Sequence, residues 1–416
     1  MILTKCAVCA TELGLTLGKK CGRCSTRYCG PECQKQHWES GGHDNLCKKI
    51  KKAGGAEQYN ANQKCTTAVA VAVEAFAEDT KDQTCYICLQ AVHRHTGEGL
   101  VRGCACHTTE GFVHVSCLAE QAKILVAEAE ENNLDYKVKN VRWKQWRTCS
   151  LCKQHYHGVV HCALGWACWK TYVGRPETDE VRHLAICRVG NGLYESGHFE
   201  DALSVREADL SMMRRIGASE EDQLIVQGNL ANTYQKLGRL EEALCMRRDV
   251  YSTALKLYGE EHKETLIDSH NYANNLICLE RFGEVKQLLH KLLPVARRVL
   301  GDHDIITLSM RKVYARAICC GAFCDPSVTL DDVCEGVSTL EDAGRIARRV
   351  LGEAHPATVD IEHHITCARA AEEMLRAAPP DHWWHTAGGP RRPAATQFTA
   401  PSWGKRSTVI FTMQKV

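Results

Sequence analysis

Cysteine is the feature that most constrains this chain, because the 416 residues include 25 cysteines. Seven of them lie before residue 48 and seven more lie between Cys85 and Cys152, mostly as close pairs. Such a count indicates disulfides in a small secreted protein, and bound metal or redox chemistry in an intracellular one. A cysteine pair begins at Cys6 with no apolar leader before it. We therefore expect a cytoplasmic or nuclear protein whose thiols bind metal.

Charge and hydropathy exclude several other classes. Lys plus Arg (52) nearly balance Asp plus Glu (50), so the net charge gives no overall electrostatic attraction to nucleic acid or a membrane surface. Ten basic and four acidic residues in 1–52 leave nucleic-acid binding only as a weak alternative. The longest run of small apolar residues, 68–77, contains Glu74 and is shorter than the roughly 20 residues that span a bilayer. We expect no membrane segment.

The first cysteine group predicts two zinc sites within residues 6–47. Each close pair places two ligands on one turn, within the roughly 2.3 Å reach of one Zn²⁺. About 40 residues bury too little apolar surface to fold alone, so metal would supply the folding energy. Eight ligands make two tetrahedral sites, and chain order suggests that the sites interleave. They would be Cys6, Cys9, Cys29 and Cys33 for one ion, and Cys21, Cys24, His43 and Cys47 for the other.

The stretch Tyr28-Cys29-Gly30-Pro31-Glu32-Cys33-Gln34-Lys35-Gln36-His37-Trp38, followed by His43 and Cys47, resembles a MYND-type zinc finger. It departs from that family by two extra residues before His43. The resemblance implies a surface that binds short proline-containing peptides, with Gln34 and Trp38 beside the groove. The alternative is that Trp38 only packs over the zinc site.

The second group also supplies eight ligands, and a cross-braced order assigns them to two further sites. Because protein ligands fill every position, no place is left for a catalytic water, and we expect structural zinc. The two sites would be Cys85, Cys88, His114 and Cys117, and Cys104, Cys106, Cys149 and Cys152.

The order of these ligands fits both PHD fingers and RING-CH (RINGv) domains. The second group resembles a RING-CH domain in having one residue between its third and fourth ligands. The resemblance extends to the stretches Arg102-Gly103-Cys104-Ala105-Cys106 and Gly111-Phe112-Val113-His114-Val115-Ser116-Cys117-Leu118. That resemblance implies an E3 ubiquitin ligase without a covalent catalytic residue, which positions a ubiquitin-loaded conjugating enzyme (E2). It places Ile87, Leu151 and Lys153 at the E2 contact. The alternatives are that Ile87 packs internally, that Lys153 is merely solvated, and that activity is lost while the scaffold remains.

From about residue 178 the pattern becomes helical and repeats every 42 residues or so. Gly217, Gly259 and Gly301 each end a predicted helix, and Gly352 does so after nine extra residues that fit an insertion at 319–329. Glycine there would take the left-handed conformation that caps a helix. The repeats resemble the long tetratricopeptide variant of kinesin light chains, with residues 356–375 as a closing helix.

Asparagine recurs in register on the first helix of successive repeats, although it is a poor residue in mid-helix. The family resemblance implies that these side chains bind the main chain of a peptide. The alternative is that they tie neighbouring helices together. The positions are Asn191, Asn229, Asn232, Asn271 and Asn274.

We therefore predict a multidomain chain: two small cross-braced zinc modules of α+β type with little regular structure, then an all-α tetratricopeptide-like solenoid. About four structural Zn²⁺ ions, an E2 with ubiquitin, and peptide or protein ligands are the expected cofactors and partners. The first hypothesis is a RING-CH ubiquitin ligase, and the alternative is a non-catalytic zinc-binding interaction scaffold. The predicted boundaries are 1–52 for the MYND-type finger, 53–82 for a linker, 83–173 for the RING-CH domain, 178–376 for the repeats and 377–416 for a disordered tail.

Overall fold

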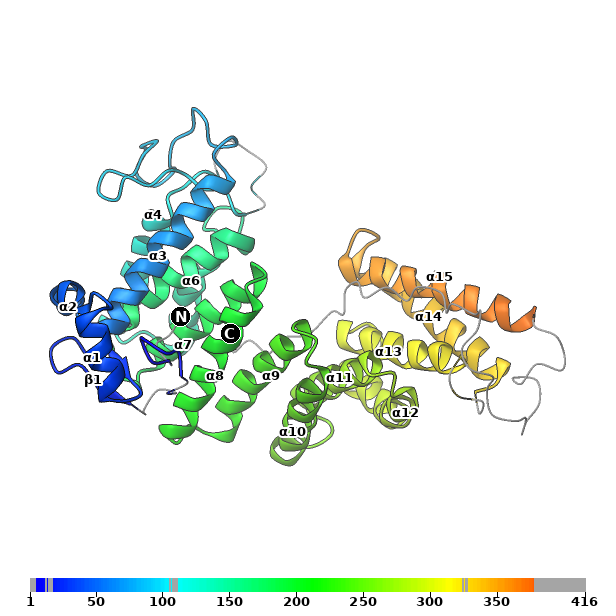
Figure 1. Ribbon diagram of the computed structural model, residues 1–416. Helices are drawn as coiled ribbons and strands as arrows, with labels where there is room; N and C mark the ends of the chain where they lie inside the picture. The colour runs from blue at the N-terminus through cyan, green and yellow to red at the C-terminus, as the bar shows by residue number, and fades with distance from the viewer. Residues whose placement is uncertain are drawn as a thin grey trace. The chain divides into compact units, whose positions relative to one another are not determined.

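The computed structural model describes residues 5–11, 13, 18–104, 106, 111–323, 325 and 328–377 (Figure 1). The predicted disordered tail lies outside these residues, apart from Ala377. The chain forms two compact units, one up to Val226 and one from Gln227 onward. Within the described residues, none of the helices combines the length and the hydropathy needed to cross a bilayer.

The first zinc module consists of a small hairpin and two helices. Strands β1 (Lys19–Lys20) and β2 (Arg27–Tyr28) are antiparallel, and α1 (Pro31–Glu39) and α2 (His43–Lys52) follow. Proline suits the first position of α1, because its missing N–H has no partner there in any helix. The module has a hydrophobic core of its own, centred on the fully buried Tyr28.

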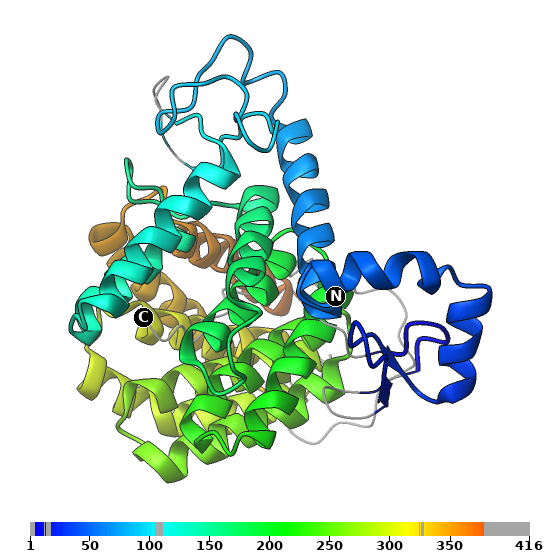
Figure 2. The same cartoon turned by 90° about the vertical axis from the view of Figure 1, so that its left-hand side faces the viewer.

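The predicted linker over 53–82 is instead largely a packed helix. Helix α3 (Ala56–Ala75) lies against α6 (Gly158–Tyr172) and buries Ala61, Cys65 and Ala72 in the core of the first unit (Figure 2). The Gln58 side-chain amide also donates a 2.9 Å hydrogen bond to the carbonyl of Lys170 in α6. The segment predicted as a linker thus contains a packed helix, in which small side chains form a close contact without a strong apolar period.

The second zinc module has little regular structure before its helices. Single antiparallel bridges join Val101 to Val113 and Thr148 to His155. The first of these helices begins directly after the zinc ligand His114 and contains the ligand Cys117. Trp146 is fully buried beneath the module, in the same core as α3 and α6. The helices are α4 (Val115–Glu131), α5 (Tyr136–Trp143) and a 3₁₀ turn, η1 (Lys144–Trp146).

Paired antiparallel helices make up most of the described residues from Glu180 onward, as the 42-residue period predicts. In the first unit α7 packs against both α6 and α8; in the second, α10 to α15 pack in succession. Helix α9 crosses the division between the units. The helices are α7 (Glu180–Glu195), α8 (Phe199–Arg215), α9 (Glu220–Lys236), α10 (Leu240–Tyr258), α11 (Lys263–Cys278), α12 (Phe282–Leu300), α13 (Ile305–Gly321), α14 (Leu330–Leu351) and α15 (Pro356–Arg376).

The four repeat glycines end their helices with positive φ, but in two different ways. After α8, the N–H groups of Gly217 and Ala218 return to the carbonyls of Arg214 and Met213, which is a Schellman cap. Gly301 has φ 89° and ψ 163°, in a region that essentially only glycine adopts, and Gly259 and Gly352 are alike. The expected left-handed helical cap therefore holds for Gly217 alone.

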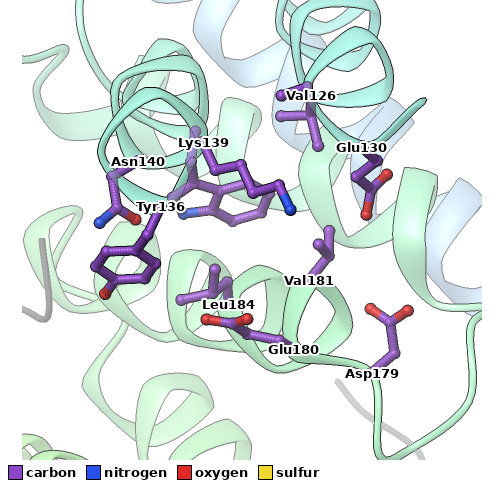
Figure 3. A pocket seen from close by; sticks show the side chains of 11 residues that line it. Val126, Glu130, Tyr136, Lys139, Asn140, Asp179, Glu180, Val181 and Leu184 are labelled. Atoms are coloured by element: carbon purple, nitrogen blue, oxygen red, sulfur yellow. The ribbon is translucent and has the colours of Figure 1, made fainter. Parts of the chain in front are cut away.

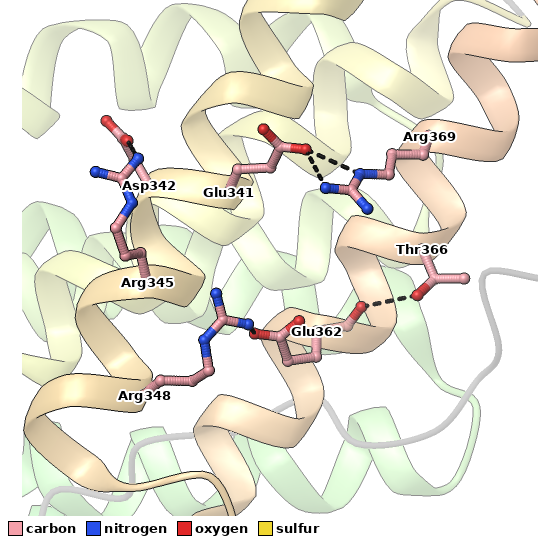
Figure 4. A network of polar contacts seen from close by, with 7 residues as sticks. All are labelled: Glu341, Asp342, Arg345, Arg348, Glu362, Thr366 and Arg369. Atoms are coloured by element: carbon pink, nitrogen blue, oxygen red, sulfur yellow. Dashed lines mark hydrogen bonds and ion pairs between the residues drawn. The ribbon is translucent and has the colours of Figure 1, made fainter.

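Helix α15 closes the second unit against α14. Buried Ile361 and Leu340 belong to the core of this unit, while ion pairs cover its surface (Figure 4). Arg369 binds Glu341 at 2.6 Å, and Arg348 binds Glu362. Because exposed pairs contribute little, the apolar contact holds α15 in place.

Candidate metal centres and contact surfaces

The first module brings its eight predicted ligands together in the two predicted sets. In the first set, the Sγ atoms of Cys9, Cys29 and Cys33 lie 3.4–3.7 Å from one another, and Cys6 completes the group. In the second set, Cys24 Sγ lies 3.4 Å from His43 Nε2, with Cys21 and Cys47 closing the tetrad. The interleaved assignment is confirmed.

The second module is cross-braced as predicted. Cys88 Sγ and Cys117 Sγ lie 3.3 and 3.6 Å from His114 Nδ1, and Cys85 is the fourth member. The other set joins Cys104, Cys106, Cys149 and Cys152, with 3.8 Å between the Sγ atoms of Cys106 and Cys149. Each module thus pairs one all-cysteine set with one set of three cysteines and a histidine.

The donor sets fit zinc. Sulfur and nitrogen ligands at the corners of a tetrahedron, at Zn–S about 2.3 Å and Zn–N about 2.0 Å, lie roughly 3.5–3.8 Å apart. The observed separations of 3.3–3.9 Å agree with that geometry. Four protein ligands at each centre leave no open coordination position, so zinc held at these four centres would be structural.

Four of the cysteine pairs adopt one and the same turn, which the spacing did not reveal. The N–H of the first cysteine donates to the carbonyl five residues on, and the N–H four residues on donates back to that cysteine's carbonyl. The residue four positions on has φ between 56° and 63°, an uncommon conformation for residues other than glycine. The first cysteines are Cys6, Cys21, Cys85 and Cys149, and the left-handed residues are Ala10, Ser25, Leu89 and Lys153.

This turn also prepares the thiolate that zinc requires. Burial alone raises the pKa of the first cysteine, but hydrogen bonds to its sulfur, chiefly from backbone N–H groups, lower the pKa by more. The net pKa shift is therefore downward, and the anionic ligand is favoured before metal arrives. The cysteines concerned are again Cys6, Cys21, Cys85 and Cys149.

Neighbouring groups orient the ligand pair at the start of α4. His114 Nε2 lies 3.4 Å from the Ala91 carbonyl, which fixes Nδ1 as the metal-facing nitrogen. The Glu98 carboxylate accepts bonds of 2.6 and 2.8 Å from the N–H and hydroxyl of Ser116. The helix therefore begins at the zinc centre.

Gln34 and Trp38 lie one turn apart on α1, so both face the same side of the helix. The Trp38 side chain is 46% exposed although its ring lies 5.8 Å from that of the ligand His43. Trp38 therefore packs beside a zinc ligand and also presents its indole to solvent, and its peptide-binding role stays a prediction.

Ile87 and Leu151 occupy the same place in two of the equivalent turns, each two residues after its first cysteine. Both are exposed, at 36% and 44%, and a 3.1 Å hydrogen bond between the Tyr86 and Ser150 hydroxyls joins the two turns. The structure thus places two apolar side chains on adjoining tips. Lys153 lies in the left-handed position of its turn and donates to the Ser150 carbonyl.

The asparagine row is largely engaged within the protein. Asn191 accepts a 2.9 Å bond from Arg206, and Asn232 accepts one from Arg247, fifteen residues on in both cases. Asn274 Nδ2 lies 3.0 Å from the ring of His270. Asn229 and Asn271 are also buried. The contacts of Asn191 and Asn232 tie neighbouring helices together, whereas that of Asn274 lies within α11, and the peptide-binding role of the row stays a prediction.

A pocket in the first unit lies among α4, α5 and the start of α7 (Figure 3). Trp143, Val126 and Leu184 give it an apolar lining, and Glu130 and Glu180 stand at its edge. Its lining includes no member of the predicted sites, and nothing in the sequence pattern pointed to it.

Comparison with known protein families finds matches in two parts of the chain. Residues 6–47 match the MYND finger family, and residues 225–264 match a tetratricopeptide repeat family. No curated protein matches the chain significantly.

Several solved structures resemble the repeats. Two are nearly identical TPR-like repeats of a putative kinesin light chain from Podosopora anserina, one of them a variant with a single substitution. They are 20% and 21% identical, with TM-scores of 0.40 and 0.39, and cover 47% of this chain and 88% and 89% of theirs. BtubC (BKLC) from P. vanneervenii is 14% identical, with a TM-score of 0.34, over 68% of this chain and 98% of its own. With TM-scores this low, the helix contacts themselves, and not these likenesses, define the repeat architecture.

Proposed function

We propose that this chain is a non-catalytic scaffold that uses its MYND-type finger and helical repeats to bind segments of partner proteins. The observation that carries the proposal is the closure of all four zinc tetrads. Zinc with four protein ligands has no position for substrate or an activated water. The metals therefore serve to hold loops and exposed side chains in place.

The contact surface on the finger is the face of α1 that carries Gln34 and Trp38. A half-exposed tryptophan on a metal-fixed helix loses little entropy on binding, which suits an aromatic anchor for a proline-containing peptide. The amide of Gln34, one turn away, can hydrogen-bond the peptide main chain.

Titration of the full chain with a panel of proline-containing peptides, followed by calorimetry, tests this proposal. Trp38→Ala should weaken binding about thirtyfold, since truncating an anchor costs about 2 kcal/mol. Tyr136→Ala is the matched control, because Tyr136 is 60% exposed on a different helix. The proposal fails if no peptide binds, or if both variants weaken binding equally while their zinc content is unchanged.

A second candidate function, E3 ubiquitin ligase activity, is favoured by one specific observation. Ile87 and Leu151 form an exposed apolar pair on two zinc turns linked by Tyr86 and Ser150. An E2 contact of the kind that the RING-CH resemblance implies would use such a pair.

Discharge of ubiquitin from a panel of loaded E2 enzymes separates the two candidates. If the chain is a ligase, Ile87→Ala should slow discharge roughly thirtyfold with zinc retained. Val92→Ala is the control, because Val92 is 58% exposed on the same module. If the intact chain discharges no E2 in the panel, the ligase candidate is rejected and the scaffold stands.

A further inference from the structure

Helices α7 and α8 bring together a histidine, a cysteine and an aspartate that belong to none of the four zinc tetrads. His183 and Cys187 are four residues apart on α7, which places them on one face, and Asp209 reaches them from α8. Cys187 Sγ lies 3.7 Å from His183 Nε2 and 3.4 Å from Asp209 Oδ2, and His183 Nε2 lies 3.4 Å from Asp209 Oδ1.

These three separations are those of metal ligands. Sulfur, nitrogen and oxygen donors on a tetrahedral Zn²⁺ lie roughly 3.4–3.6 Å apart, calculated from Zn–S of about 2.3 Å and Zn–N and Zn–O of about 2.0–2.2 Å. The structural tetrads of this same chain have separations of 3.3–3.9 Å. The donors on α7 and α8 are therefore as closely grouped as those of the four tetrads.

The buried carboxylate is an independent sign of a missing ligand. Asp209 is 3% exposed, its Oδ2 accepts a hydrogen bond from Cys187, and its Oδ1 lies 3.4 Å from His183 Nε2 without a hydrogen bond from the residues that the structure describes. A buried charge is costly unless it is paired and hydrogen-bonded or coordinates a metal. A cation between Oδ1, the thiol and the imidazole would remove that cost.

The geometry also argues against a nucleophilic Cys-His-Asp relay. In such a relay the thiol and the carboxylate bind opposite nitrogens of the imidazole, so that a proton can pass along the chain of groups. Here Cys187 and Asp209 both face the same nitrogen, Nε2. The donors converge on one point, as metal coordination requires.

We propose that His183, Cys187 and Asp209 form a fifth metal site, a three-ligand zinc site on helices α7 and α8. Mixed nitrogen, sulfur and oxygen donors suit zinc, and three protein ligands leave one position for water or an incoming donor. The His183 side chain is 21% exposed, so solvent can reach the site. This ion is therefore more weakly held than the other four, and exchanges first.

The chain contains a matched control for this arrangement. His363 and Cys367 have the same four-residue spacing on α15 and the same 3.7 Å separation between Nε2 and Sγ. Within the described residues, however, no third ligand completes that pair. If two ligands at this spacing bound zinc by themselves, both pairs would bind it; if the carboxylate is required, only the α7 pair does.

Metal analysis of the full-length protein, purified with zinc and desalted without chelator, gives the first test. The expected content is five zinc ions per chain, falling to four in Cys187→Ala and Asp209→Asn and staying at five in Cys367→Ala. Four ions in the wild type, or an unchanged five in Cys187→Ala, would overturn the proposal.

Cobalt provides a second test that does not depend on the variants folding. After a weak chelator removes the loosely bound ion from the wild-type chain, added Co²⁺ should give tetrahedral visible bands with a single thiolate charge-transfer band. Asp209→Asn should weaken that uptake about a hundredfold or more. Absence of Co²⁺ uptake by the wild-type chain would refute the site even if the variants unfold.

Discussion

Replacing Asn232 with alanine removes the side-chain oxygen that accepts a hydrogen bond from Arg247. The perturbation is severe because Asn232 is 1% and Arg247 is 2% exposed. Water cannot readily take the place of the lost acceptor. If the main role of Asn232 is to hold this guanidinium, the variant should lose stability instead of ligand affinity.

The magnitude follows from two opposing effects. A buried donor that loses its partner costs about 1–3 kcal/mol, and more for a charged group. Alanine is the better helix former in α9, which offsets about 0.5 kcal/mol of this loss in stability. The net loss is then roughly 0.5–2.5 kcal/mol, which lowers the melting temperature of a unit of this size by roughly 1–10 °C.

Thermal melting of the full chain, followed by far-ultraviolet circular dichroism, measures this loss. Asn191→Ala is the matched variant, because Asn191 accepts the same kind of bond from Arg206 but is only partly buried, so its loss should be smaller. A double-mutant cycle of Asn232→Ala with Arg247→Gln should be clearly non-additive. An unchanged melting curve together with lost peptide binding would refute the reasoning and place Asn232 in a binding groove.

Three further outcomes are expected. Burial raises the pKa of Asp268 to about 7 against the lowering effect of Arg247, so the stability associated with its protonated form is present at low pH and is lost as pH rises through 7. The free energy of unfolding of Asp268→Asn, relative to that of wild type, should therefore rise by on the order of 2–4 kcal/mol between pH 5 and pH 8, as measured by urea unfolding. A strong zinc chelator should unfold both zinc modules while most of the far-ultraviolet signal of the repeats remains, and loss of the whole signal would contradict separate stabilisation. Gly301→Ala should destabilise the chain by roughly 1–3 kcal/mol through backbone strain alone, whereas Gly283→Ala, at an equally open position without positive φ, should be neutral or stabilising in the same melting assay.

Spacing predicted the zinc tetrads because metal geometry is strict. Two ligands on one turn must share an ion, so four pairs in interleaved order leave few ways to assign the ligands to two ions. The repeated turn with a left-handed residue was not predictable, since Ala10, Ser25, Leu89 and Lys153 have no side-chain type in common. Backbone hydrogen bonds define this turn, and the type of side chain at the left-handed position does not.

Contacts between helices account for the rest of what the sequence could not predict. The register of Asn191 and Asn232 was visible, but the partners Arg206 and Arg247 are identified only once the second helix of each repeat is packed. Asp209 lies 22 residues from Cys187, so only the α7–α8 pairing brings it to the thiol. Sequence periodicity predicts that helices pair, and not which side chains meet between them.

The central claim is that four zinc ions are fully enclosed by protein ligands and serve only to hold contact surfaces in place. X-ray absorption at the zinc edge of Cys187→Ala, which lacks the fifth site, tests it most directly. The account predicts four ions per chain that share fourteen sulfur and two histidine nitrogen ligands, with no oxygen near 2.0 Å. An oxygen ligand, or fewer than four ions, would show an open or missing centre and contradict the account.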